Sequence, residues 1–292
     1  MDILEETLKH YIDLDMYANT VIEELMEEYN LCYDECVHIL LSSDYYNTKL
    51  SYSNAYTAIK ESVNSFSAKL NERMVKEAES VNTTELNFLK KVYDGILVVG
   101  AVSAAKTLFT PIDGRDTTKM FVDRTTKNIL HSYDTSLRYG YIFGQPSADI
   151  KLNIDKALKQ TVRGMQNGIQ TAIPSYAKST DRIIFLNNKV EVIWNSTLDG
   201  NTCITCASLS GLRFSSVSEA PGVQHERCRC ILTPASVAEE IPTYEEFINK
   251  LSEEDQLHIL GKNRFNLWKN GDITLNKFIN NGEKVLLKDL EY

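Results

Sequence analysis

Residues 194–234 read WNSTLDGNTCITCASLSGLRFSSVSEAPGVQHERCRCILTP and hold four of the six cysteines and one of the five histidines in the chain. Their spacing is Cys203-x2-Cys206, eighteen residues, then His225-x2-Cys228-x-Cys230. Two cysteines three apart can bend a turn around one ion, and a second pair from a returning segment completes a tetrahedral set of thiolate and imidazole ligands. We therefore predict a structural zinc site.

Five side chains compete for four ligand positions. If residues 228–230 are extended, the thiols of Cys228 and Cys230 point to one face, so either could be the fourth ligand. A disulfide remains an alternative, although nothing in the sequence suggests an oxidising compartment. A thioredoxin-like redox pair at Cys203 and Cys206 would leave the later histidine and cysteines unexplained. Chance clustering is the third alternative.

Most of the remaining sequence has helical periodicity, with apolar residues recurring every three to four positions. Cys32 and Cys36 fall on one helical face and are expected in the core. A turn at Pro111–Gly114 marks the internal boundary that we expect. The predicted helices are residues 2–29 with a break near Asp15, 48–80, 86–109 with a start at Asn82–Glu85, 117–139, and Ser147 to about Ile173.

The sequence pattern changes from helical to strand-like just before the cysteines. Residues 182–186 and 189–195 are rich in β-branched side chains and flank Asn187-Asn188. Asparagine tolerates the positive φ of a two-residue turn, so we predict a β-hairpin. Residues 212–214 and 230–233 can add short strands. After Pro234 the chain returns to helix, with capping boxes expected at Thr243/Glu246 and Ser252/Asp255 and a helix end at Gly261.

The predicted fold class is α+β, mainly α: a helical body with a small zinc-stapled β-hairpin module near the C-terminus. Four regions are expected. They are a helical N-terminal region (1–110), a further helical part (111–181), the β-hairpin and Cys/His module (182–234) and a helical tail (235–292).

Composition and charge restrict the function. With 43% hydrophobic and 24% charged residues, the chain is typical of soluble proteins, and no signal peptide or membrane span is expected. The net charge of −9 is uneven, because the first 40 residues carry eleven acids and one base. This segment is either a solvated acidic helix face or a docking surface for a basic partner. Its negative charge disfavours the binding of nucleic acid to these residues.

The cysteine stretch resembles the phage head morphogenesis family, the Mu F-like minor head proteins. The likeness rests on Trp194, Asp199, Thr202-Cys203-x2-Cys206, Leu209-x-Gly211 and His225-x2-Cys228-Arg229-Cys230-x-Leu232-x-Pro234. It continues in Tyr244–Phe247, Gln256–Gly261, Arg264 and Leu267, so that it covers roughly residues 115–290. The chain departs from the family at Gly200-Asn201, where members usually carry a basic residue, and at Gln224, where they have proline.

The resemblance implies a minor capsid protein of a tailed bacteriophage, made in the host cytoplasm and incorporated into the virion head. Its expected partners are the portal protein, the major capsid or scaffolding protein, and non-specific DNA during packaging or ejection. No membrane partner is expected.

Two other function classes were compared with this one. A zinc-module nucleic-acid-binding regulatory protein is the alternative, because residues 150–234 carry ten bases against six acids. A zinc enzyme is disfavoured, since the chain lacks His-Glu-x-x-His and the deaminase ligand order, and five candidate ligands indicate a closed site. We expect no catalytic residues.

Overall fold

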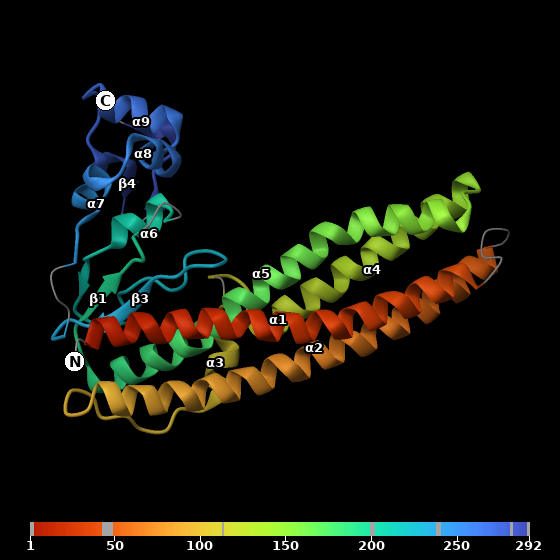
Figure 1. The fold of residues 1–292 in the computed structure, drawn as a ribbon, viewed down its shortest axis with the longest axis horizontal. Helices are drawn as coiled ribbons and strands as arrows, with labels where there is room; N and C mark the ends of the chain where they lie inside the picture. Colours follow the sequence, from red (N-terminus) through yellow and green to blue (C-terminus); the bar gives the residue numbers. More distant parts are fainter. Residues whose placement is uncertain are drawn as a thin grey trace. The chain divides into compact units, whose positions relative to one another are not determined.

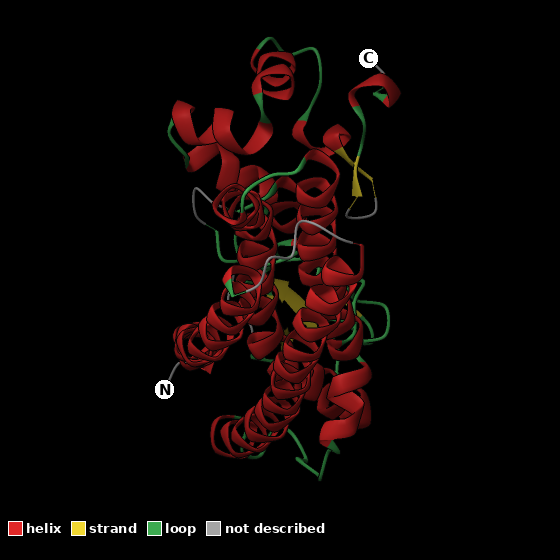
Figure 2. Ribbon diagram, turned by 90° about the vertical axis from the view of Figure 1, so that its right-hand side faces the viewer, coloured by secondary structure: helices red, strands yellow, loops and turns green. Residues whose placement is uncertain are grey.

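The computed structural model describes residues 3–42, 49–112, 114–198, 202–237, 241–280 and 283–290. Long helices account for most of the chain, and a small antiparallel sheet lies in its C-terminal part (Figures 1 and 2). The predicted fold class, α+β and mainly α, is confirmed. No helix among the described residues has both the length and the apolar character needed to cross a membrane.

The chain folds into two compact units, each assembled from separate segments. The first comprises Met1–Tyr11, Glu85–Val102 and Lys178–Tyr292, and the second comprises Ile12–Thr84 and Ser103–Ala177. The turn expected near residue 111 therefore lies inside the second unit; Gly114 there has a φ of 82°, and residue 113 is outside the described residues.

Among the described residues, the second unit is built from one short helix and the greater part of four long helices. The bounds of these helices are α1 (Ile3–Leu41), α2 (Lys49–Val92), α3 (Ala104–Phe109), α4 (Thr118–Phe143) and α5 (Ser147–Asn188). The end segments of α1, α2 and α5 belong to the first unit. Side-chain hydrogen bonds link each long helix to two others. They join Tyr17 to Glu77 (α1–α2), Ser67 to Thr126 (α2–α4), Thr118 to Tyr176 (α4–α5) and Gln170 to Asp15 (α5–α1). The result is a closed ring of four helices.

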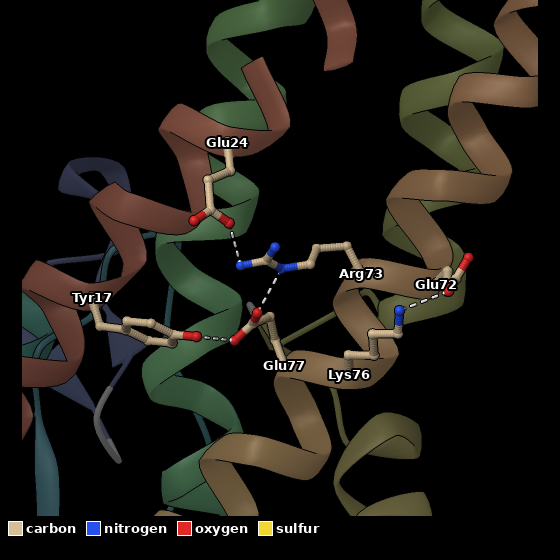
Figure 3. Close-up of polar contacts among 6 residues, drawn as sticks. All are labelled: Tyr17, Glu24, Glu72, Arg73, Lys76 and Glu77. Atoms are coloured by element: carbon tan, nitrogen blue, oxygen red, sulfur yellow. Dashed lines mark hydrogen bonds and ion pairs between the residues drawn. The ribbon is translucent and has the colours of Figure 1, made fainter. Parts of the chain in front are cut away.

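Part of the acidic face of α1 is paired with α2. Arg73 lies between Glu24 of α1, at 2.5 Å, and Glu77 of its own helix, at 2.6 Å (Figure 3). Tyr17 donates to the same Glu77 at 2.7 Å. Lys69 and Glu28 form a further pair at 2.6 Å. The Arg73–Glu24 and Lys69–Glu28 pairs are partly exposed, so each contributes little stability, but together they orient α1 against α2.

The helix boundaries predicted in the N-terminal half were wrong in three places. The expected break near Asp15 is absent, because the Asp15 side chain accepts a hydrogen bond from Gln170 and α1 continues through it. The expected start at Asn82–Glu85 lies inside α2, because Glu85 is fully buried and Asn82 nearly so. Helix α2 ends at Val92, so the expected helix over 86–109 is interrupted: residues 93–103 are not helical, whereas 86–92 belong to α2 and 104–109 form α3. Burial of polar side chains at helical spacing overrode the local capping signal.

Other helix predictions are confirmed. Cys32 and Cys36 are buried core residues. Thr117 accepts a hydrogen bond from the amide of Met120 and starts α4. The Thr243/Glu246 capping box begins α7, and Ser252 caps α8.

The first unit contains a three-stranded sheet and a two-stranded one, β4 (Ile279–Asn280) with β5 (Glu283–Lys284). Strand β1 (Val192–Asn195) is central, and β2 (Arg213–Phe214) and β3 (Ile231–Pro234) pair with it antiparallel on either side. Trp194, Leu232 and the cysteines pack in one core with Phe185 of α5 and Tyr93, which follows α2. A second core joins α6 (Ile204–Leu209) to the tail helices, which are α7 (Tyr244–Lys250), α8 (Glu253–Leu260) and α9 (Lys262–Lys269).

The β-hairpin predicted over 182–195 was wrong in its first arm. Residues 182–188 are the last two turns of α5, which also continues past the end expected near Ile173. Ile184 and Phe185 are buried in the core of the first unit, so packing outweighs their β propensity. The asparagines do mark a change of direction: Asn188 bonds both backbone groups of Val98, and Lys189 adopts a φ of 53°.

Candidate metal centre

The two halves of the cysteine cluster come from different local structures. Cys203 caps the N-terminus of α6, where its sulfur accepts a hydrogen bond from the amide of Cys206 at 3.4 Å. The second half precedes β3 and contains a turn closed by the Cys228 amide and the His225 carbonyl at 3.2 Å. Arg227 in this turn has a φ of 59°, in the left-handed region that favours glycine. The antiparallel pairing of β1 and β3 brings the two halves together.

All five ligands predicted from the sequence meet in this cluster. The His225 Nε2 atom lies 3.3 Å from the Cys203 sulfur and 3.2 Å from the Cys206 sulfur. The sulfurs of Cys206 and Cys228 are 3.8 Å apart, and Cys230 lies within 4.8 Å of both. All six cysteines belong to the described residues and are free thiols. The cluster can therefore bind a metal ion through sulfur and nitrogen.

The orientation of the histidine ring suits metal binding. Nδ1 of His225 lies 2.7 Å from the carbonyl oxygen of Glu226, which can only accept a hydrogen bond. Nδ1 must therefore carry a hydrogen, and Nε2 faces the cysteines. Ring orientation by such a bond is typical of metal-ligating histidines.

The side chains of the cluster perturb one another's protonation. Hydrogen bonding from Cys206 and then from His225 lowers the pKa of Cys203 to about 4. The hydrogen bond to Cys203 raises the pKa of His225 to about 9. Hydrogen bonds from Cys206 and Cys230 also lower the pKa of Cys228. Without metal, the cluster thus holds thiolates beside a protonated imidazole, and a bound cation would replace the ring proton and ionise coordinating thiols.

Two cations of α5 hold the loop that carries the second ligand pair. Lys178 donates to the carbonyl of Cys228 at 2.6 Å. Arg182 donates to three carbonyls, those of Val217, Ala220 and Pro221, at 2.8–2.9 Å. Because residues 215–230 contain no helix or strand, these bonds replace backbone pairing and position the loop.

Sequence reasoning missed these supporting residues. It placed Arg182 in a strand, and a single lysine such as Lys178 has no characteristic spacing to other residues that would reveal its role. Only a helical interpretation of 176–188 would have put Lys178 and Arg182 four apart on one face.

A cavity of about 30 Å³ lies beside Cys228 and Cys230, lined also by Lys178, Asp181 and Trp194. That volume holds a water molecule but not a substrate.

Comparison of the chain with protein-family models, with curated proteins and with solved structures finds no match.

Proposed function

We propose that this chain is a minor capsid protein of a tailed-phage head, with a structural and interaction role and a C-terminal module held by one zinc ion. The observation that carries the proposal is the cysteine cluster. Its four cysteines and His225 lie together in the structure, and they belong to the stretch of sequence that resembles the head morphogenesis family. The proposed role is non-catalytic, because five candidate ligands for four positions indicate a closed site.

Zinc is the metal that suits the donor set. Bonds of about 2.3 Å to sulfur and about 2.0–2.1 Å to nitrogen place the ligand atoms of a tetrahedron about 3.5–3.8 Å apart. The contacts of 3.2, 3.3 and 3.8 Å in the cluster come close to this. Three of the cysteines are almost completely buried, as in a closed structural site.

The portal protein is the proposed partner, with the major capsid or scaffolding protein and non-specific DNA as further contacts in procapsid assembly and DNA packaging or ejection. The proposed location is the virion head. Support for these partners comes from the resemblance. Asp13, Glu23, Glu27 and Asp34 of α1 are exposed, and such an acidic face suits a basic partner surface.

The decisive experiment is gradient sedimentation of the protein co-expressed with the portal protein encoded nearest its gene, beside each protein alone. Co-migration at a fixed ratio is expected. The control is a Cys206→Ser variant, which should lose zinc and, if the module makes the contact, lose co-migration. Separate migration of two folded proteins would refute the portal role.

A zinc-module DNA-binding regulator is the second candidate, favoured by the excess of basic residues over 150–234. It predicts duplex DNA binding that weakens steeply with salt and discriminates between sequences. Binding that is salt-sensitive but blind to sequence would argue against a regulator.

A further inference from the structure

One ridge of α1 carries acids that face solvent. Met16, Glu23 and Glu27 follow one another at spacings of seven and four residues, which keeps them on one line of the helix surface. All three side chains are exposed, Met16 to 64%. The neighbouring Glu24 is bonded to Arg73 of α2 (Figure 3). Among the described residues, by contrast, no base forms an ion pair with Glu23 or Glu27.

A ridge of α5 has the same spacing and the opposite charge. Leu152, Lys159 and Arg163 again stand seven and four residues apart, and Lys156 lies between them on the same line. All four side chains are exposed, Leu152 to 51%. No carboxylate in the described part of the chain pairs with Lys156, Lys159 or Arg163.

Each ridge by itself is electrostatically unfavourable, because like charges four residues apart on a helix repel each other. This holds for the two glutamates of the α1 ridge and for Lys159 and Arg163 of the α5 ridge. If the two ridges lay side by side and parallel, each of these charges would meet its opposite and the two apolar side chains would meet each other. The facing pairs would be Met16 with Leu152, Glu23 with Lys159, and Glu27 with Arg163.

Within one chain the two ridges cannot meet in this way, because α1 and α5 are neighbours that run antiparallel. Asp15 of α1 accepts a hydrogen bond from Gln170 of α5. Tyr33, farther along α1, bonds to Asp155, which comes earlier in α5. In a second copy related by a two-fold axis perpendicular to the helices, α1 is reversed and runs parallel to α5 of the first copy. The same axis pairs the second α5 with the first α1, so both pairings form at once and the assembly closes.

We propose that this chain forms a two-fold symmetric dimer in which the α1 ridge of each copy lies along the α5 ridge of the other. A second copy is the occupant that fits, because the opposite charges and the shared spacing both belong to this sequence. The interface lies within the second unit and needs neither the metal centre nor a capsid partner. Exposed ion pairs are individually weak and are screened by salt, so the dimer has modest affinity and dissociates as salt rises.

The test is the oligomeric state of the full chain, measured by sedimentation velocity in about 50 mM and about 500 mM salt. We expect a dimer in low salt and a shift towards monomer in high salt. Glu23→Lys with Glu27→Lys should weaken dimerisation by more than about tenfold, because attraction becomes repulsion at every charged contact. Lys159→Glu with Arg163→Glu should do the same. All four reversals in one chain restore opposite charges across the interface and should restore the dimer.

Lys127→Glu is the matched control, since it reverses an exposed base of α4 that lies outside both ridges and should leave the dimer unchanged. If one double variant does not fold, the other double variant decides. A wild-type chain that is monomeric in both salts would overturn the proposal, as would a dimer that resists both double reversals or an assembly that grows beyond two copies. A monomeric chain that binds duplex DNA through Lys159 and Arg163 would assign the α5 ridge to a polyanion and would equally overturn it.

Discussion

Gly168 of α5 lies against the ring of Phe121 of α4, and replacing it with alanine should strain the second unit. A Cβ at this position would stand 2.1 Å from Phe121 Cε2 and 2.7 Å from Cδ2 and Cζ. Phe121 is 1% exposed, so its ring has no free space into which to move. Gly164, one helical turn earlier, would place its Cβ with no atom within 4 Å and is the matched control.

Both substitutions gain the higher helix propensity of alanine, but only Gly168→Ala also overpacks the contact with Phe121. Gly→Ala in a helix interior gains about 0.8–1.0 kcal/mol at either site. Overpacking at Gly168 costs about 1–3 kcal/mol, and the 2.1 Å approach favours the upper part of that range. We therefore expect Gly164→Ala to stabilise the protein by up to about 1 kcal/mol. Gly168→Ala should be less stable than Gly164→Ala by about 1–3 kcal/mol, which is the overpacking term.

Equilibrium unfolding in urea, followed by the helical circular dichroism signal, measures this difference from the midpoints. A Phe121→Leu substitution should offset part of the loss in Gly168→Ala, because it removes the ring atoms that clash. Equal stability of the two alanine variants would show that the helices separate without cost, and the close packing argued from Gly168 would be refuted.

Three other predictions concern the first unit. Burial raises the pKa of Glu85 to about 7 from its ordinary value of 4.5, so the stability it contributes is complete below pH 4.5 and is lost as the pH rises through about 7. The free energy of unfolding should therefore fall by about 3 kcal/mol less between pH 4.5 and pH 8 in Glu85→Gln than in the wild type. Urea unfolding at the two pH values checks this, and the same fall in both proteins would contradict it. Chelation of the metal should make residues 202–237 sensitive to protease while the second unit stays resistant, as limited proteolysis with mass spectrometry would reveal; a module that stays resistant would speak against a structural metal. Thr243→Ala should cost about 1 kcal/mol by removing the α7 capping box, seen as a lower urea midpoint, whereas Thr243→Ser should retain it.

Short-range features of the sequence predicted much of the fold. The predicted caps at Thr243 and Ser252 are present because each depends on a side chain and an amide three residues away. The burial of Cys32 and Cys36 followed from their helical spacing. In the same way, the Cys-x-x-Cys and His-x-x-Cys spacings predicted the cluster of cysteines and His225 that could bind a metal ion.

Contacts between distant segments decided the rest. Residues 182–186 carry β-branched side chains that suit a strand or a buried helix equally well, and packing of Ile184 and Phe185 in the core selected the helix. Glu85 belongs to a stretch, Asn82–Glu85, that was predicted to start a helix, but it lies buried inside α2, hydrogen-bonded to His10, 75 residues earlier.

By itself, the sequence determined which residues could bind a metal and where helices are capped, because those properties depend on chemistry within a few residues. Only the tertiary structure decided how far α1, α2 and α5 extend, because the free energy of burial comes from partners far along the chain. It likewise decided that Lys178 and Arg182 hold the loop that carries the second ligand pair, since each of these bonds joins residues more than thirty positions apart.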